Sequence, residues 1–63
     1  MEGYQDRVVV EKDELDERIE KLTNFIQSVK FQSIPEEEQE LLTRQLEVMR
    51  EYSSILEERI EGF

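Results

Sequence analysis

The single proline of the chain, Pro35, interrupts a helical spacing of apolar residues that runs on both sides of it. Proline fits the first turn of a helix, where its missing N–H would have no partner. Ser33 and Glu36 have the spacing of a capping box, in which a hydroxyl and a carboxylate satisfy free amides at a helix start. The run Glu36–Glu38 follows where the helix dipole favours anions, so we interpret it as a helix start rather than a metal site. The sequence therefore predicts two helices joined by a turn at about residues 31–34.

The stretch before this break has a narrow apolar seam. Its apolar residues recur at spacings of seven, four, three, four and three, and they are Val8, Leu15, Ile19, Leu22, Ile26 and Val29. This periodicity predicts one helix over about residues 4–30. On a helical wheel the seam covers about 80° of arc, and Tyr4 projects onto it. A seam this narrow is suited to one neighbouring helix.

The stretch after the break predicts a second helix, over about residues 34–61, with a much wider apolar face. The apolar residues cover about 180° of the wheel. They are Leu41, Leu42, Leu46, Val48, Met49, Tyr52, Ile55, Leu56, Ile60 and Phe63. Because one partner helix does not cover so wide a face, we expect residues 1–63 to form one all-α domain, an antiparallel two-helix hairpin of the coiled-coil kind, completed by oligomerisation.

The length and composition also favour oligomerisation. A chain of 63 residues without cysteine has no disulfide to compensate for a small core, and without histidine it lacks the usual zinc ligand sets. The simplest assembly is a homodimer that forms a four-helix bundle through the second helices. The predicted interface residues are Leu41, Leu42, Gln45, Met49, Tyr52, Leu56 and Arg59.

Two polar residues, Gln45 and Arg59, lie near the middle of the apolar arc of the second helix. Burial makes such residues costly unless they are paired. One interpretation is a polar layer that sets the register of the bundle, with Arg59 paired to a glutamate. The other is the polar lining of a pocket at the oligomer interface.

One flank of the first helix combines cations with an aromatic ring. Arg7, Arg18 and Phe25 share nearly one direction on the wheel, with Lys21 beside them. Such a flank can hold a phosphate and stack a base, because Arg provides a planar fork for phosphate oxygens and a ring offers its face to a nucleobase. The alternative is a set of surface salt bridges. The carboxylates within reach of Arg18 are those of Glu11 and Glu14.

The charge excludes some classes of partner. The chain has 17 acidic and 8 basic residues, for a formal net charge of −9. It is repelled by the backbone of bulk nucleic acid and by anionic lipid surfaces, both of which reward clustered Lys and Arg. No apolar run approaches the roughly 20 residues of a membrane span, and the N-terminus lacks the basic and apolar regions of a signal peptide. We therefore expect an intracellular protein that binds neither membrane nor bulk nucleic acid directly.

The sequence contains no enzyme motif. The only glycines, Gly3 and Gly62, lie near the ends, so there is no glycine-rich phosphate loop. Carboxylates are abundant, but no pair is set apart by a cleft that would shift its pKa. We expect a non-catalytic protein without catalytic residues, metal ligands or a cofactor.

Two longer stretches resemble a known family. The first is Tyr4-Gln5-x-Arg7-Val8-Val9-x-Glu11 with Glu14-Leu15-x-x-Arg18-Ile19-x-Lys21-Leu22-x-x-Phe25-Ile26-x-Ser28. The second is Gln39-x-Leu41-Leu42-x-x-Gln45-Leu46-x-x-Met49-x-x-Tyr52-x-x-Ile55-Leu56-x-x-Arg59-Ile60. Over nearly the full length, this pattern resembles a widespread family of very small proteins of tailed phages and prophages. Its members are usually labelled crAssphage-related uncharacterised proteins.

The resemblance implies a phage or prophage origin, a helical hairpin and no established activity. Small early phage proteins are commonly counter-defence factors. One such group, the anti-CBASS sponges, is similar in architecture, with helical hairpins that oligomerise and hold cyclic oligonucleotides between subunits. The analogy implies a protein of the host cytoplasm that sequesters a cyclic-nucleotide immune signal. The residues implied are Tyr4, Phe25 and Tyr52 for base stacking, and Arg7, Arg18 and Lys21 for phosphate binding.

Two other functions remain open. An acidic interaction protein or DNA mimic could block a host DNA-binding factor, for which the second half is better suited. Residues 33–63 have 9 acids and 3 bases, or −6, against 8 acids and 5 bases, or −3, in residues 1–32. The third candidate is a structural or accessory phage protein whose helices serve to bind partner helices.

Overall fold

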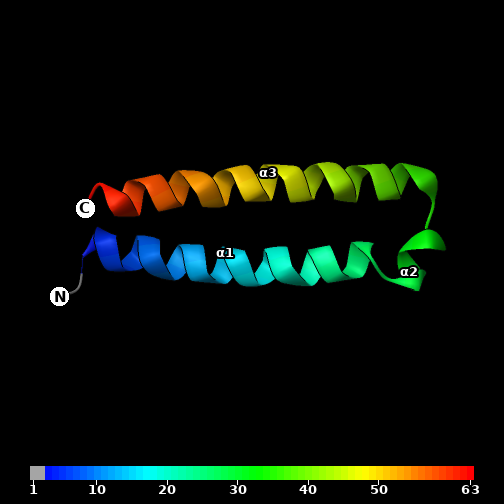
Figure 1. The fold of residues 1–63 in the computed structure, drawn as a ribbon, viewed down its shortest axis with the longest axis horizontal. Helices are drawn as coiled ribbons and strands as arrows, with labels where there is room; N and C mark the ends of the chain where they lie inside the picture. The colour runs from blue at the N-terminus through cyan, green and yellow to red at the C-terminus, as the bar shows by residue number, and fades with distance from the viewer. Residues whose placement is uncertain (1–2) are drawn as a thin grey trace.

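The structure, a computed structural model, describes residues 3–63; Met1 and Glu2, the start of the predicted 1–63 domain, lie outside the described residues. Three helices follow one another: α1 (Tyr4–Ile26), α2 (Val29–Gln32) and α3 (Glu36–Glu61). Helices α1 and α3 lie side by side and antiparallel, so that the start of α1 and the end of α3 are at the same end of the molecule (Figure 1). The predicted all-α hairpin is confirmed.

The apolar seams of the two long helices meet along the length of the hairpin. Val8 and Leu15 of α1 and Leu56 of α3 form its buried core. Residues packed against this core are Ile19, Met49 and Ile60, and Leu46 is buried as well. At the open end, the rings of Tyr4 and Phe63 pack edge to face with their centroids 5.6 Å apart. The narrow seam predicted for the first helix is therefore the face that α1 buries, except at Tyr4 and Val29, which are exposed.

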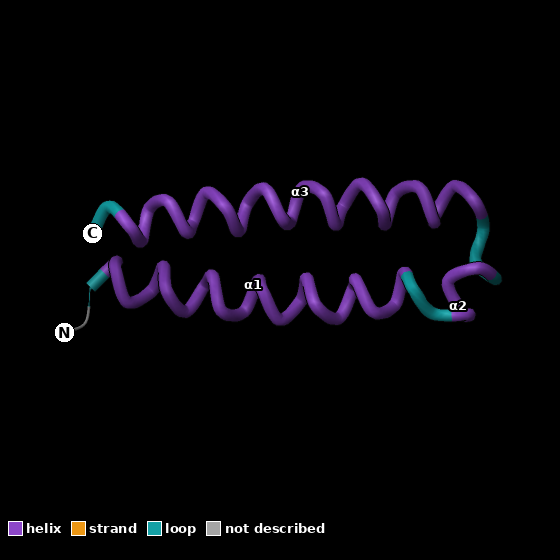
Figure 2. Tube along the Cα trace, in the orientation of Figure 1, coloured by secondary structure: helices purple, strands orange, loops and turns teal. Residues whose placement is uncertain are grey.

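The turn differs from the prediction. Helix α1 ends at Ile26, and α2 is a separate four-residue helix on the connection to α3 (Figure 2). The backbone at Ser28 is extended, and its hydroxyl donates to the Phe25 carbonyl at 2.6 Å. Serine competes with the helix for backbone partners in this way. The predicted helix over residues 4–30 thus ends about four residues early, and Val29 is 83% exposed instead of lying in the seam.

The break brings two aromatic rings together. Phe31 of α2 turns back so that its ring packs edge to face on Phe25 of α1, with centroids 6.0 Å apart. Aromatic pairs in this geometry contribute stability beyond that which comes from burying their apolar area. This contact holds α2, and with it the segment between α1 and α3, against the end of α1.

The start of α3 confirms one prediction and corrects another. Glu36, Glu37 and Glu38 occupy its first turn, as expected for anions at the positive end of the helix dipole. The capping box is wrong, because the Ser33 hydroxyl donates to the Lys30 carbonyl at 2.7 Å and no side chain caps α3. Instead, the Gln39 amide donates to the Ile34 carbonyl at 2.9 Å. The Gln39 side chain therefore joins the start of α3 to the segment that precedes it.

Candidate functional site

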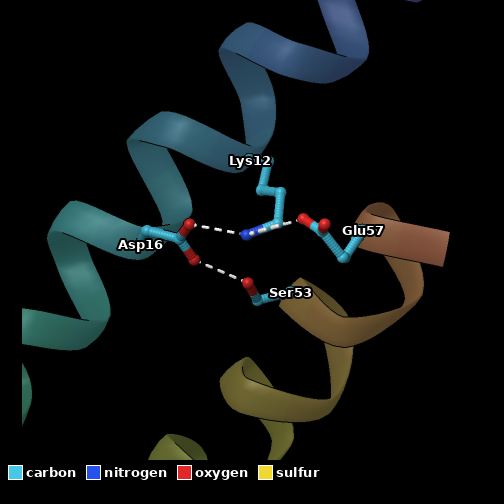
Figure 3. A network of polar contacts seen from close by, with 4 residues as sticks. All are labelled: Lys12, Asp16, Ser53 and Glu57. Carbon is cyan, nitrogen blue, oxygen red and sulfur yellow. Dashed lines mark hydrogen bonds and ion pairs between the residues drawn. The ribbon is translucent and has the colours of Figure 1, made fainter. Parts of the chain in front are cut away.

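A polar network links α1 to α3 along one edge of the hairpin (Figure 3). The Lys12 ammonium lies 2.7 Å from Asp16 Oδ2 and 3.6 Å from Glu57 Oε1, and the Ser53 hydroxyl donates to Asp16 Oδ1 at 2.5 Å. Ser53 is buried and Lys12 is largely covered. The Lys12 stem can therefore pack along the seam while its charged end reaches the edge.

The network changes the proton affinity of its charged members. Hydrogen bonds from Lys12 and then Ser53 lower the pKa of Asp16. The hydrogen bond to Asp16 and the nearby negative charges raise the pKa of Lys12, against partial desolvation. Within residues 3–63, every buried side-chain nitrogen or oxygen has a hydrogen-bond partner. The polar groups of the network are paired with one another. We therefore interpret the network as a structural contact that fixes the register of α1 against α3.

Sequence reasoning missed this network although the signal was present. The seven-residue gap between Val8 and Leu15 is twice the usual seam step, and Lys12 occupies the missing seam position. On α3, Ser53 likewise lies four residues after Met49 and three before Leu56. A polar residue at each of these seam positions predicts a polar contact between facing helices.

A further polar contact lies on the same edge of the hairpin as the network, with Arg50 Nη2 donating to Thr23 Oγ1 at 3.4 Å. The candidate ligand residues lie on the other side of α1. On a helical wheel at about 100° per residue, the buried seam of α1 separates two sides of the helix. Asp16 and Thr23 lie on one side of the seam, and Arg7, Arg18 and Phe25 lie on the other. They therefore belong to the opposite side of the hairpin, which we call the second face.

The exposed apolar row of α3 shares this second face. Leu41, Val48 and Ile55 are 55%, 64% and 50% exposed. Their positions on the wheel are turned from the core in the direction opposite to Ser53. The second face thus combines the cationic flank of α1 with the apolar row of α3.

The flank of α1 divides into two groups along the helix. Arg18, Lys21 and Phe25 lie within eight residues, or about 10 Å of helix, whereas Arg7 lies about 16 Å before Arg18. Arg18 and Lys21 are exposed and Phe25 is half-buried against Phe31. The predicted ligand set is therefore not one compact cluster.

The two ends of the flank also differ in electrostatic surroundings. Arg7 shares a shallow depression with Val10 and three carboxylates, those of Asp6, Glu11 and Glu14. Tyr4 at this end is exposed, with its ring against Phe63. Among residues 3–63, the ion pairs within 4.0 Å involve Lys12, so the salt bridges considered for Arg18 are not formed. Arg18 and Lys21 are thus exposed cations without an ion pair among the described residues.

The predicted oligomer interface mixes two rows of α3. Leu42 and Met49 are half-buried on the side of α1, and Leu56 is fully buried with 0% exposure. Leu56 therefore has no surface to offer another copy, and its assignment to the interface is wrong. The remaining predicted residues are exposed; they are Leu41, Gln45, Tyr52 and Arg59.

The fold is that of a small helical-hairpin protein with an exposed second face. Comparisons with known proteins match the chain over nearly its full length. The chain belongs to the Sequestin family, whose model matches residues 2–62. It is 43% identical over 63 residues to an uncharacterized 7.5 kDa protein in the denB-rIIB intergenic region of Enterobacteria phage T4. The aligned region covers 100% of this chain and 98% of that relative. No solved structure matches the chain.

These matches bear on the resemblance seen in the sequence. The membership of a small phage protein family is confirmed. The link to crAssphage-related proteins is found in neither match. Within residues 3–63, none of the helices is both long and apolar enough to span a membrane.

Proposed function

We propose that this chain is a non-catalytic phage protein that sequesters a cyclic-nucleotide immune signal in the host cytoplasm. The family name, Sequestin, denotes sequestration, and a relative of nearly equal length is encoded by a phage. A protein that acts by holding a signal needs an accessible site and no catalytic group. The proposal agrees with the absence of an enzyme motif in the sequence.

The observation that carries the proposal is the group formed by Arg18, Lys21 and Phe25. Two exposed cations and an aromatic ring lie within about 10 Å of one helix, on the side that the hairpin leaves uncovered. Arg18 and Lys21 supply the charge-assisted hydrogen bonds that phosphate oxygens accept. Phe25 supplies a ring edge or face for a base. Arg7, with its carboxylate neighbours, is the weaker candidate for a phosphate contact.

The net charge of −9 does not forbid such a ligand. At physiological ionic strength the Debye length is about 8 Å, so exposed charges further from the site than this are largely screened. What a phosphate experiences is mainly the local balance around Arg18 and Lys21. Glu14 and Glu17 lie four residues before Arg18 and Lys21 respectively, so they are the carboxylates nearest to the two cations on the helix.

A thermal-shift panel of cyclic di- and trinucleotides tests the proposal. A ligand at 100 times its Kd adds about 2.7 kcal/mol to the free energy of unfolding, which a shift in Tm reports. The double variant Arg18→Ala/Lys21→Ala should lose the shift. Arg50→Ala, which removes a cation from the network edge, should keep it. A folded protein that no member of the panel stabilises would overturn the proposal.

A second candidate is the acidic interaction protein that blocks a basic host factor. The observation in its favour is a shallow depression at the turn end, lined by Phe31, Thr43 and the carboxylates of Glu36, Glu37 and Glu40. Salt-sensitive binding of a purified basic DNA-binding protein, reduced by Glu37→Gln/Glu40→Gln, would support it. The double variant Glu57→Gln/Glu61→Gln is the matched control.

A further inference from the structure

Helix α3 carries a second complete seam beside the one that packs on α1. The first seam consists of residues four and three apart in alternation, namely Leu42, Leu46, Met49, Ser53, Leu56 and Ile60. The second has the same spacing, one residue earlier, and consists of Leu41, Gln45, Val48, Tyr52, Ile55 and Arg59. All six residues of the second seam are exposed. A seam of this spacing is the pattern by which one helix packs along another.

The surface area indicates how much the single hairpin leaves uncovered. Its accessible surface is 5165 Å² for a mass of 7.6 kDa, and a compact monomer of this mass exposes about 4300 Å². The excess is close to the roughly 800 Å² that each partner buries in a standard protein interface. The radius of gyration is 14.5 Å, against about 10.6 Å expected for a compact domain of this length. The excess area therefore suits one further partner along the hairpin.

We propose that a second copy of this chain covers the second seam, with the two α3 helices antiparallel. The register sets Val48 of one copy opposite Tyr52 of the other. By the same spacing, Leu41 faces Arg59 and Gln45 faces Ile55. Each aliphatic residue thus meets a longer side chain whose apolar stem covers it while its polar end reaches water.

Charge selects the antiparallel direction. In a parallel pair, Arg59 would meet Arg59 of the other copy and the acidic turn Glu36–Glu38 would meet itself. In the antiparallel pair, Arg59 lies beside Leu41 of the other copy, at the level of the nearby Glu37 and Glu40 carboxylates. Each Arg59 then has carboxylates of the other copy nearby, one such pairing at each end of the seam.

The dimer also brings the ligand groups of both copies together. The twofold axis falls between Val48 and Tyr52. Arg50 contacts Thr23 of α1 and Ser53 contacts Asp16, so the axis lies at the level of residues 16–23 of α1, around Ile19. Arg18 and Lys21 are each within two residues of Ile19, on the second face. They therefore approach the axis from both copies. This consequence rests on the proposed function, whereas the dimer itself does not.

The angle between the two seams sets the distance between the two α1 helices. Seams offset by one residue lie about 100° apart around the helix. With packed helices 8–10 Å apart, this angle places the two α1 helices about 11–13 Å from each other. A helix with its side chains is about 10–12 Å across, so Arg18 and Lys21 of the two copies line a shallow groove between the α1 helices. A cyclic dinucleotide, with two phosphates of its own, matches two copies of the Arg18 and Lys21 pair.

Cysteine cross-linking tests the register, because the natural chain has no cysteine. Leu41→Cys and Arg59→Cys are prepared separately and mixed under mild oxidation. The antiparallel dimer predicts a disulfide between the two variants and little cross-linking of either variant alone. Self-cross-linking of each variant alone would show a parallel pair and overturn the proposal. Equal cross-linking of Glu47→Cys, on the outer side of α3, would show random collision and overturn it as well.

Light scattering tests the assembly and separates it from ligand binding. The natural protein should show twice the chain mass, and Val48→Glu should halve it without loss of helical circular dichroism. A monomer, or a mass above two chains, overturns the dimer but leaves the nucleotide test of Arg18 and Lys21 standing. If Val48→Glu abolishes nucleotide binding together with dimerisation, the shared groove is supported as the binding site. If the monomeric variant binds with undiminished affinity, the shared groove is overturned as the binding site.

Discussion

The two seams of α3 have identical spacing and opposite surroundings. The first has five apolar residues and one serine, and the hairpin buries it. The second has three aliphatic residues alternating with Gln45, Tyr52 and Arg59, and it is exposed. Because burial of apolar area is the main favourable term, the seam richer in apolar residues packs against α1 within the chain. Spacing alone thus shows that a helix can pack in two directions, and composition decides which direction is used first.

The largest difference between the seams should appear on truncation to alanine. Leu56→Ala in the first seam should lower the free energy of unfolding by about 3–5 kcal/mol, because a fully buried leucine leaves a cavity. Leu41→Ala in the second seam should cost less than about 0.5 kcal/mol at a dilution that separates the copies. Urea denaturation followed by circular dichroism measures both. Similar losses at the two positions would contradict the contrast between the seams.

The serine within the first seam should matter more than its neighbour. Ser53→Ala removes the hydroxyl that donates to Asp16, and we expect a loss of about 1 kcal/mol, since a hydrogen bond to a charged group is among the stronger ones. Ser54→Ala is the matched control, because Ser54 is exposed and alanine is the better helix former. It should leave stability unchanged or slightly raised. If both variants lose the same amount, Ser53 contributes no specific contact.

The smallest expected effect is on pH dependence. The pKa of Asp16 is lowered from 3.8 by its hydrogen bonds from Lys12 and Ser53. A carboxyl with a lowered folded-state pKa contributes stability above its unfolded pKa and loses it as the pH falls through the folded value. The natural protein should therefore lose more stability than Asp16→Asn between about pH 5 and pH 2. Parallel acid profiles for the two proteins would show that the network is energetically silent.

Much of the fold was predictable from local pattern. The two helices, their antiparallel pairing and the acidic first turn of α3 follow from apolar spacing, a single proline and three glutamates. The errors occur where a local pattern had two outcomes. Val29 continues the seam of α1 in sequence, but Ser28 and the packing of Phe31 on Phe25 end the helix first. Ser33 has capping-box spacing, but its hydroxyl turns back to Lys30.

The candidate site was predictable in part. Arg18, Lys21 and Phe25 share one flank of a helix by spacing alone, and the structure keeps them on one uncovered side. The distance that separates Arg7 from this group follows from helical rise once the helix is established. The contacts of Lys12 and Ser53 with Asp16 were missed because nothing distinguishes either residue from other polar surface residues until the facing helix is in place.

By itself, the sequence determined two amphipathic helices, a turn between them and more apolar surface on α3 than one neighbour can cover. These properties depend on residues close together in the chain, where helical period and proline decide the outcome. The tertiary structure alone decided which of the two seams faces α1, that Leu56 belongs inside the hairpin, and that Lys12 meets Asp16 and Ser53. A helix can turn by one residue about its axis at little local cost. Its orientation is therefore set by the packing and hydrogen bonds that only the neighbouring helix supplies.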